Sequence, residues 1–201
     1  MASYAVHLAV ANVYLEKNKN ENREDFINGT IDVDYVDDKV SSHYTGNIDK
    51  SNLKRFLSQK VILPNYVKKN QIDTSYNRGY FLHLLTDYYF YNEFFNKAWI
   101  DSIDYSKFKE VMYNEYPLIT DYLKEKYTVI FPKRIEKYSF SKKGNPIILT
   151  NDSIGEFIDF IGNIDLNQTY STIKNDLEGG KQNGTQNETT SKVLWLYFSR
   201  Y

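Results

Sequence analysis

Cysteine is absent from the 201-residue sequence, which excludes disulfide bonds, thiolate metal sites and cysteine nucleophiles. Histidine is scarce, with three residues in the whole chain. Any metal ligands therefore have to come from these histidines and from carboxylates.

An excess of charge of one sign is also lacking. The 25 lysines and arginines nearly balance 26 acidic residues, which gives a formal charge of -1. This balance provides no field that would draw the protein onto nucleic acid or an anionic membrane. No basic stripe with interleaved aromatic residues occurs either, so nucleic acid is not an expected partner.

Long apolar runs are missing as well. No segment approaches the roughly 18 apolar residues of a membrane-spanning helix, so we expect no stable membrane insertion. The opening stretch MASYAVHLAVANVYLEK carries His7 among its apolar residues and has no basic residue ahead of them. This differs from a signal peptide and predicts a mature, soluble, cytoplasmic protein.

Apolar and aromatic residues are plentiful, at 41% and 16%, enough for one compact core. Apolar residues that recur at helical spacing predict an all-α, multi-helix bundle. The segment Tyr76 to Trp99 is apolar on nearly every side and should be the central buried helix. Other helices are expected from Ser3 to about Glu16, from Asp49 or Ser51 to just before Pro64, from Tyr105 to Lys126 with a kink or break at Pro117, and after a cap at Asp152 or Ser153.

Some stretches lack this periodicity. Residues 28–49 are rich in Gly, Asp and Ser and predict a long acidic loop, a feature that is often functional. Residues 127–150 predict irregular chain or at most a short hairpin. We expect one helical metal-binding domain over residues 1–176, a flexible polar linker over 177–192 and an apolar C-terminal segment over 193–201.

Two polar residues interrupt the apolar central helix. His83 and Asp87 are four residues apart, so they share one helix face. A buried carboxylate costs several kcal/mol unless it is paired, protonated or bound to a metal. The pair therefore fits a metal site or a hydrogen-bonded core pair. Gly79, one turn earlier, either allows another backbone to approach closely or marks the start of the helix.

The remaining candidate site residues are weak evidence for a metal site when taken one at a time, and stronger evidence as a set. His7 falls on the inward face of the first helix and would often be a core histidine, whereas His43 ends the acidic loop and would often be solvated. Lys39 either steadies an anionic substrate or is solvated. The aspartates of the loop favour a solvated acidic face when taken singly; they are Asp32, Asp34, Asp37 and Asp38. Taken as a set, histidines in apolar or acid-rich surroundings indicate a ligand shell.

These residues also follow a recognisable order. His7 comes first, and then the motifs Phe26-x-x-Gly29-x-x-x-x-Asp34, Ser42-His43-Tyr44 and Gly79-Tyr80-x-x-His83-x-x-x-Asp87. This order resembles the zinc-dependent phospholipase C family, whose all-helical fold is shared with the P1 and S1 nucleases. The resemblance spans roughly residues 3 to 95, and its motifs are short but jointly specific.

The resemblance implies a set of metal ligands. Four residues would match one zinc site of the family: Asp34, His43, His83 and Asp87. Asp87 would bridge to a neighbouring metal with His7 as its histidine ligand. The third zinc of the family uses a histidine at a spacing that here gives Glu93, a possible additional ligand or an ordinary exposed charge.

These residues suggest a chemistry. Imidazole and carboxylate ligands suit zinc best and also accept other divalent metals, so we expect one or two zinc ions. The leading hypothesis is a metal-dependent hydrolase of phosphoric esters, acting on a small phosphorylated or phospholipid-like substrate. Asp34 would be the catalytic carboxylate that accepts a proton from water. The alternative is a non-catalytic helical module with a structural ion or a polar His/Asp core that binds a partner.

Overall fold

The computed structural model describes residues 2–95 and 97–183, and every regular element in these ranges is helical. The all-α prediction is therefore confirmed. In chain order the elements are α1 (Tyr4–Lys17), α2 (Arg23–Asp32), α3 (Lys39–Ser42), α4 (Leu53–Ser58), α5 (Leu63–Val67), α6 (Ser75–Tyr89), the π-helix η1 (Phe90–Phe94), α7 (Lys97–Ser102), α8 (Tyr105–Tyr127), the 3-10 helix η2 (Lys133–Tyr138), α9 (Asn151–Gly162) and α10 (Leu166–Asn183).

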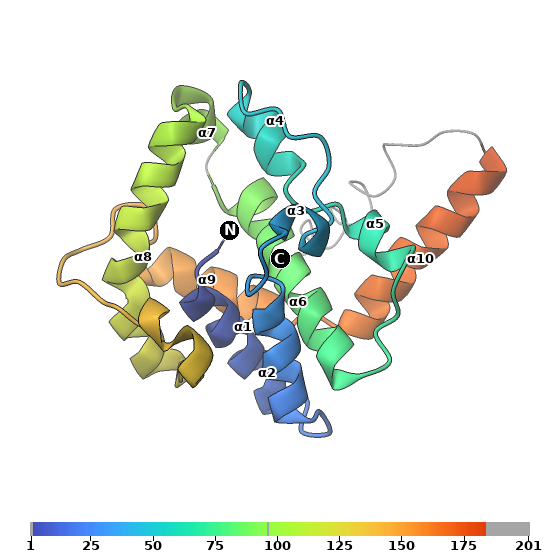
Figure 1. Ribbon diagram of the computed structural model, residues 1–201, viewed down its shortest axis with the longest axis horizontal. Helices are drawn as coiled ribbons and strands as arrows, with labels where there is room; N and C mark the ends of the chain where they lie inside the picture. Colours follow the sequence, from blue (N-terminus) through green and yellow to red (C-terminus); the bar gives the residue numbers. More distant parts are fainter. Residues whose placement is uncertain (1, 96, 184–201) are drawn as a thin grey trace.

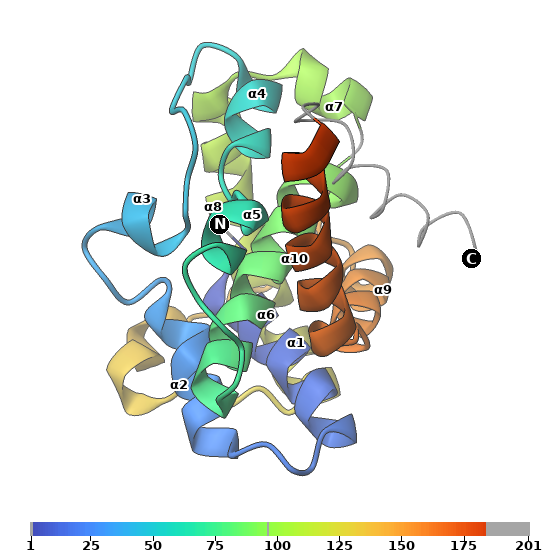
Figure 2. The same ribbon diagram turned by 90° about the vertical axis from the view of Figure 1, so that its right-hand side faces the viewer.

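Helix α6 lies in the middle of the molecule, with α8 on one side and α10 on the other (Figure 1). The turned view places α10 across α6, next to α5 (Figure 2), and α10 contacts both. Most of α6 is buried, including Phe81, Leu82 and Leu85. The prediction of a central buried helix is therefore confirmed, although the predicted segment is divided among α6, η1 and the start of α7.

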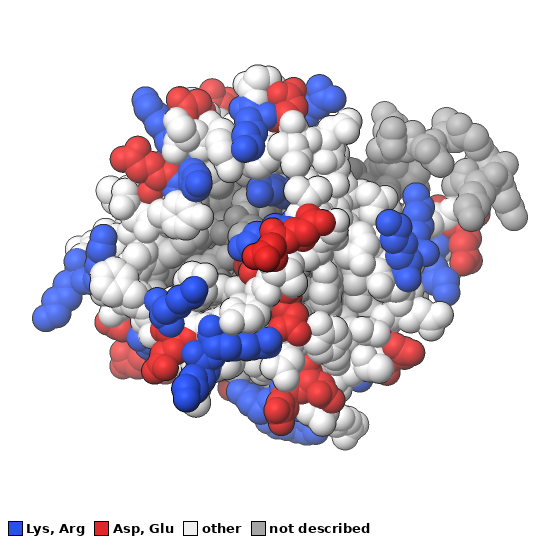
Figure 3. Space-filling model, in the orientation of Figure 1, with Lys and Arg blue, Asp and Glu red and all other residues white. Residues whose placement is uncertain are grey.

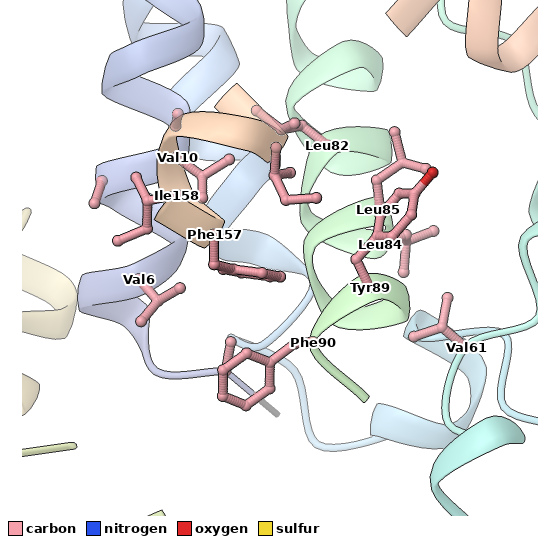
Figure 4. Close-up of a cluster of buried hydrophobic side chains, with 14 of the residues drawn as sticks. Val6, Val10, Val61, Leu82, Leu84, Leu85, Tyr89, Phe90, Phe157 and Ile158 are labelled. Atoms are coloured by element: carbon pink, nitrogen blue, oxygen red, sulfur yellow. The ribbon is translucent and has the colours of Figure 1, made fainter. Parts of the chain in front are cut away.

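The core joins α6 to the first helix and to α9. Figure 4 shows Phe157 of α9 between Val6 and Val10 of α1 and the leucines of α6. Val6 and Val10 are fully buried. Ser3 accepts the backbone N–H of Val6, which confirms the predicted cap of the first helix. None of the helices that the structure describes has both the length and the apolar character to cross a membrane.

The short helix predicted to end before Pro64 is confirmed as α4, in which Leu53, Phe56 and Leu57 are buried. Pro64 lies in the first turn of the next helix, α5, where its missing N–H costs nothing. The predicted cap of α9 was wrong, because Thr150 caps this helix rather than Asp152 or Ser153. Of the kink or break predicted at Pro117, the break is excluded, because α8 continues through this residue.

The long loop predicted over residues 28–49 was also partly wrong, because α2 extends to Asp32 and α3 forms a further turn. Gly29 suggested a loop because glycine is a poor helix former. In the structure a Cβ on Gly29 would lie 2.0 Å from the carbonyl oxygen of Tyr76. Because glycine has no side chain at this position, α2 can pack closely on α6.

Of the two structures predicted for residues 127–150, the irregular chain is confirmed and the short hairpin does not form, because this stretch contains η2 and no strand. Backbone N–H groups near the end of this stretch donate to a side chain rather than to a neighbouring strand. The buried carboxylate of Glu115 on α8 accepts the N–H groups of Ile147, Ile148 and Leu149 at 2.9–3.1 Å. One carboxylate thus provides the hydrogen-bond acceptors for three backbone N–H groups that would otherwise be unpaired.

Helix α10 runs to Asn183, so it includes residues 177–183 of the predicted linker. The rest of the linker, residues 184–192, and the predicted apolar segment 193–201 lie outside the described residues.

Candidate metal centre

Five of the predicted site residues come from four separate parts of the chain. His7 is on α1, and His83 and Asp87 are on α6. Asp34 lies in the turn after α2, and His43 is the C-terminal cap of α3. All five side chains are buried, with exposed fractions of 0 to 6%. The fold thus brings together residues that are up to 80 positions apart in the sequence.

The crossing of α2 and α6 fixes the geometry of this cluster. A Cβ on Gly79 would lie 2.0 Å from the carbonyl oxygen of Phe26, so the two backbones touch at this point. The hydroxyl of Thr30 donates to the carbonyl oxygen of Gly79 at 3.2 Å. Of the two interpretations of Gly79, the structure supports close backbone approach.

Backbone carbonyls orient two of the histidines. Nδ1 of His83 lies 2.8 Å from the carbonyl oxygen of Thr30, and Nδ1 of His43 lies 3.0 Å from that of Lys39. A carbonyl oxygen can only accept, so each Nδ1 carries the proton. When His83 is neutral, its Nε2 lone pair faces the cluster, an arrangement typical of metal-binding histidines.

The ring of His7 packs against that of His83. The rings of His7 and His83 are stacked, with centroids 3.6 Å apart and an angle of 7° between their planes. Nε2 of His7 is 3.4 Å from Oδ1 of Asp87. His7 therefore faces Oδ1 of Asp87, whereas His43 and His83 face Oδ2.

Asp87 is the centre of the cluster. Its Oδ1 accepts the backbone N–H of Ala2 at 2.9 Å. Its Oδ2 is 3.4 Å from Nε2 of His43 and 3.8 Å from Nε2 of His83. One carboxylate thus faces all three histidines, as a bridging ligand would.

The distances in the cluster are longer than charged hydrogen bonds, which are typically about 2.7–2.9 Å. Nε2 of His43 is 3.4 Å from Oδ1 of Asp34, from Oδ2 of Asp87 and from Nε2 of His83. Zinc bonds of about 2.0–2.1 Å place two ligands of a tetrahedron about 3.3–3.4 Å apart. The spacing therefore matches that of a metal-ligand shell.

Several buried polar atoms in the cluster have no hydrogen-bond partner among the described residues. They are both ring nitrogens of His7, Oδ1 of Asp34 and Oδ2 of Asp87. Buried polar atoms are normally paired, because an unpaired one costs about 1–3 kcal/mol. A cation would satisfy these atoms together.

The cluster shifts the pKa of His83 and of His43 in opposite directions. Burial lowers the pKa of His83 to about 3, and the neighbouring His7 lowers it further, so His83 is neutral at pH 7. Burial alone would lower the pKa of His43, but the adjacent carboxylates of Asp34 and Asp87 raise it to about 9.

The carboxylates shift in the opposite direction from buried acids in general. Burial would raise the pKa of Asp34, but the adjacent His43 and the nearby His83 lower it to about 2. The adjacent His43 and His7 hold the pKa of Asp87 well below its usual value in spite of burial. At pH 7 Asp34 and Asp87 are therefore carboxylates and His43 is an imidazolium, whose proton a bound ion would displace.

Two overlapping groups in this cluster can hold a metal ion. One consists of Asp34, His43 and His83, and the other of His7, His83 and Asp87. Glu93 is exposed on η1 and belongs to neither group. Asp32 pairs instead with Arg134 and accepts the hydroxyl of Tyr76 at 3.0 Å.

The cluster reaches the surface through His43. This residue lines a pocket of about 180 Å³ together with Lys39, Lys50 and Lys60. The face of the molecule in Figure 3 is hollowed near α3 and α4, with basic side chains close by. Lys60 was not predicted from the sequence, because only the fold brings it to this position.

No protein-family model, curated protein or solved structure matches this chain. A function has to be argued from the residues and the geometry of the chain itself.

Proposed function

We propose that the chain is a metal-dependent hydrolase of phosphoric esters. The observation that carries this proposal is the set of buried, unpaired ligand atoms on His7, Asp34 and Asp87, spaced like the ligands of a metal ion. The order of these residues in the sequence supports it, because it resembles the zinc-dependent phospholipase C family. By the same resemblance we propose the phospholipase C/P1 nuclease arrangement for the helical bundle.

We assign the first ion to Asp34, His43, His83 and Asp87. His7 and Asp87 would help to hold a second ion. Nitrogen and oxygen ligands without thiolate favour zinc, and they also accept other divalent metals. Such an ion supplies Lewis-acid polarisation of a phosphoryl oxygen and lowers the pKa of a bound water toward about 7.

Asp34 is the carboxylate with the best access to substrate. It is 6% exposed, whereas Asp87 is fully buried, and its Oδ1 lies 3.8 Å from the exposed ammonium of Lys39. Asp34 is ionised at pH 7, so it can accept a proton from an attacking water. Its low pKa makes it a weak base, which favours its role as a ligand.

The second candidate function is that of a non-catalytic module with a polar core. The raised pKa of His43 favours it, because an imidazolium between Asp34 and Asp87 can close the cluster without an ion. In that case the cluster would stabilise the fold, and function would lie in binding a partner.

A matched pair of variants tests the proposal. We expect the zinc-loaded chain to release 4-nitrophenol from 4-nitrophenyl phosphate or bis(4-nitrophenyl) phosphate. Asp34→Asn should lower kcat by about 100-fold or more, as loss of an acid-base group or ligand does. Asp32→Asn, two residues away and outside the cluster, should stay within a few-fold of wild type. A stable, zinc-loaded wild type that cleaves no phosphoric ester would leave only the non-catalytic module.

A further inference from the structure

We infer that the lysine-lined pocket beside His43 binds an anionic group of the substrate, so that the site selects phosphoric esters carrying a second negative charge. This inference rests on the proposed function for the reaction itself. The pocket would determine which phosphoric esters are preferred. The occupant is defined by its chemistry: a small phosphate or carboxylate next to the ester being cleaved.

The charge of the pocket has one sign. Lys39, Lys50 and Lys60 line it, and no acidic residue does. Among the ion pairs of the described residues, Lys39 contacts Asp34, whereas neither Lys50 nor Lys60 pairs with a carboxylate. Three like charges around a small volume repel one another, and a bound anion would relieve that repulsion.

Lys60 is the residue that distinguishes this pocket from a set of surface lysines. Its side chain is partly buried. Burial lowers its pKa, and the charges of Lys50 and Lys39 lower it further, whereas Asp87 and Asp34 act in the opposite direction. An ammonium that is partly desolvated and close to other cations gains more from an anion than a solvated one does.

Aromatic rings hold two of the ammonium groups in place. The Lys60 ammonium lies 4.8 Å from the ring centre of Phe56, and that of Lys50 lies 5.3 Å from that of Tyr105. The two rings pack edge to face, with centroids 4.7 Å apart. Cation-π contacts of this kind are attractive, so the two rings, which also line the pocket, help to hold these ammonium groups in it.

Backbone contacts fix the position of Lys60 as well. The hydroxyl of Thr45 donates to the carbonyl oxygen of Lys60 at 3.0 Å. The N–H of Gly46 donates to the carbonyl oxygen of Gln59 at 2.8 Å. These bonds connect the end of α4 to the segment after His43, so the lysine and the metal ligand are held relative to each other.

The size and position of the pocket define the substrate class. Pockets for drug-sized ligands are about 300–1,000 Å³, so 180 Å³ accepts one small group. His43 belongs to both the pocket and the cluster, which places that group next to the reacting ester. A cationic head group such as choline or ethanolamine would be repelled.

A binding measurement on the metal-free protein tests the pocket independently of catalysis. Titration of the metal-free full chain with 2-phosphoglycolate at low ionic strength should show binding. Lys60→Met and Lys50→Met should each weaken it by about tenfold, the scale of a lost charge-assisted contact. Lys54→Met, an exposed lysine on α4 outside the pocket, should bind as wild type does. Absence of binding to wild type, or equal binding by all three variants, would overturn the inference.

A substrate series tests the selectivity. The 4-nitrophenyl phosphodiesters of glycolic acid, ethylene glycol and ethanolamine differ in the charge of one small group. We expect the zinc-loaded chain to cleave them in that order, with kcat/KM falling at least about tenfold from the anionic to the cationic ester. Lys50→Met should reduce this ratio. Cleavage of all three esters at equal rates would refute the inference while leaving the proposed function intact. Binding of phosphoglycolate without any turnover would refute the proposed function and leave the pocket standing.

Discussion

His43 links the two carboxylates of the cluster, and its titration gives the first prediction. In the metal-free protein its pKa is raised from 6.5 to about 9. A raised pKa means that the stability contributed by the imidazolium is complete below pH 6.5 and is lost as the pH rises through about 9. A metal ion has to displace the same proton.

The apparent affinity for zinc should therefore rise by about tenfold per pH unit up to about pH 9. Competition with a chromophoric chelator at several pH values measures this slope. His83 stays neutral over the whole range because its pKa is lowered to about 3, so it adds nothing to the slope. An affinity that does not change between pH 7 and pH 9 would contradict the assignment of His43 as a ligand.

Glu115 gives a prediction about stability. Its carboxylate accepts the N–H groups of three successive residues, Ile147 to Leu149. In Glu115→Gln an amide N–H would face one of these donors, and we expect a loss of about 1–3 kcal/mol in the free energy of unfolding. Urea unfolding measures the loss. Glu110→Gln, exposed on the same helix, is the control and should unfold like wild type.

The histidines and aspartates that meet in the cluster could be named from the sequence, whereas the groups that support them could not. Each of the three histidines stood in an apolar or acid-rich setting, and all three meet in the cluster. The carbonyl oxygens of Thr30 and Lys39, which orient two of the rings, carry no such signal, because every residue has a carbonyl group. Lys60 was missed because its partners in the pocket depend on the tertiary fold.

At the scale of elements, the contact between α2 and α6 positions the site. Gly79→Ala would place a Cβ against the carbonyl oxygen of Phe26 and push the helices apart at the point where Thr30 meets His83. We expect a loss of about 1–3 kcal/mol in stability, the usual cost of overpacking, together with weaker zinc binding. Thermal unfolding and a zinc titration measure the two effects.

A second glycine on a helix provides the control. No atom lies within 4 Å of the Cβ position of Gly179 on α10. Gly179→Ala should therefore leave zinc binding unchanged and raise stability by up to about 1 kcal/mol, because alanine is the better helix former. Equal effects of the two substitutions would show that helix propensity, rather than the crossing, decides the outcome.

Element predictions succeeded where periodicity was strong and failed where tertiary packing decided the structure. The first and central helices follow directly from their apolar spacing. Helix α2 was missed because Gly29 weakens the local preference for helix, and only the neighbouring α6 explains the glycine. The possible hairpin after residue 127 failed because Glu115, far away in the sequence, supplies the acceptors of the turn.

At the scale of the whole molecule, the cluster ties α1, the turn after α2, α3 and α6 to one point. An ion bound there would connect four segments in addition to the packing and the hydrogen bonds that already join them. Since a ligand that binds only the folded state stabilises it, zinc should raise the stability of the entire helical domain.

The central claim is that this cluster binds a metal ion, and thermal unfolding with metal analysis tests it most directly. We expect one or two zinc ions per chain and a melting midpoint that falls by about 5–10 °C on chelation, the scale of about 2.7 kcal/mol at a 100-fold excess over Kd. Adding zinc should restore the midpoint in wild type and in the exposed control Asp121→Asn, and should have no effect in Asp87→Asn. A folded wild type that contains no metal and melts at the same temperature with and without zinc would contradict the claim.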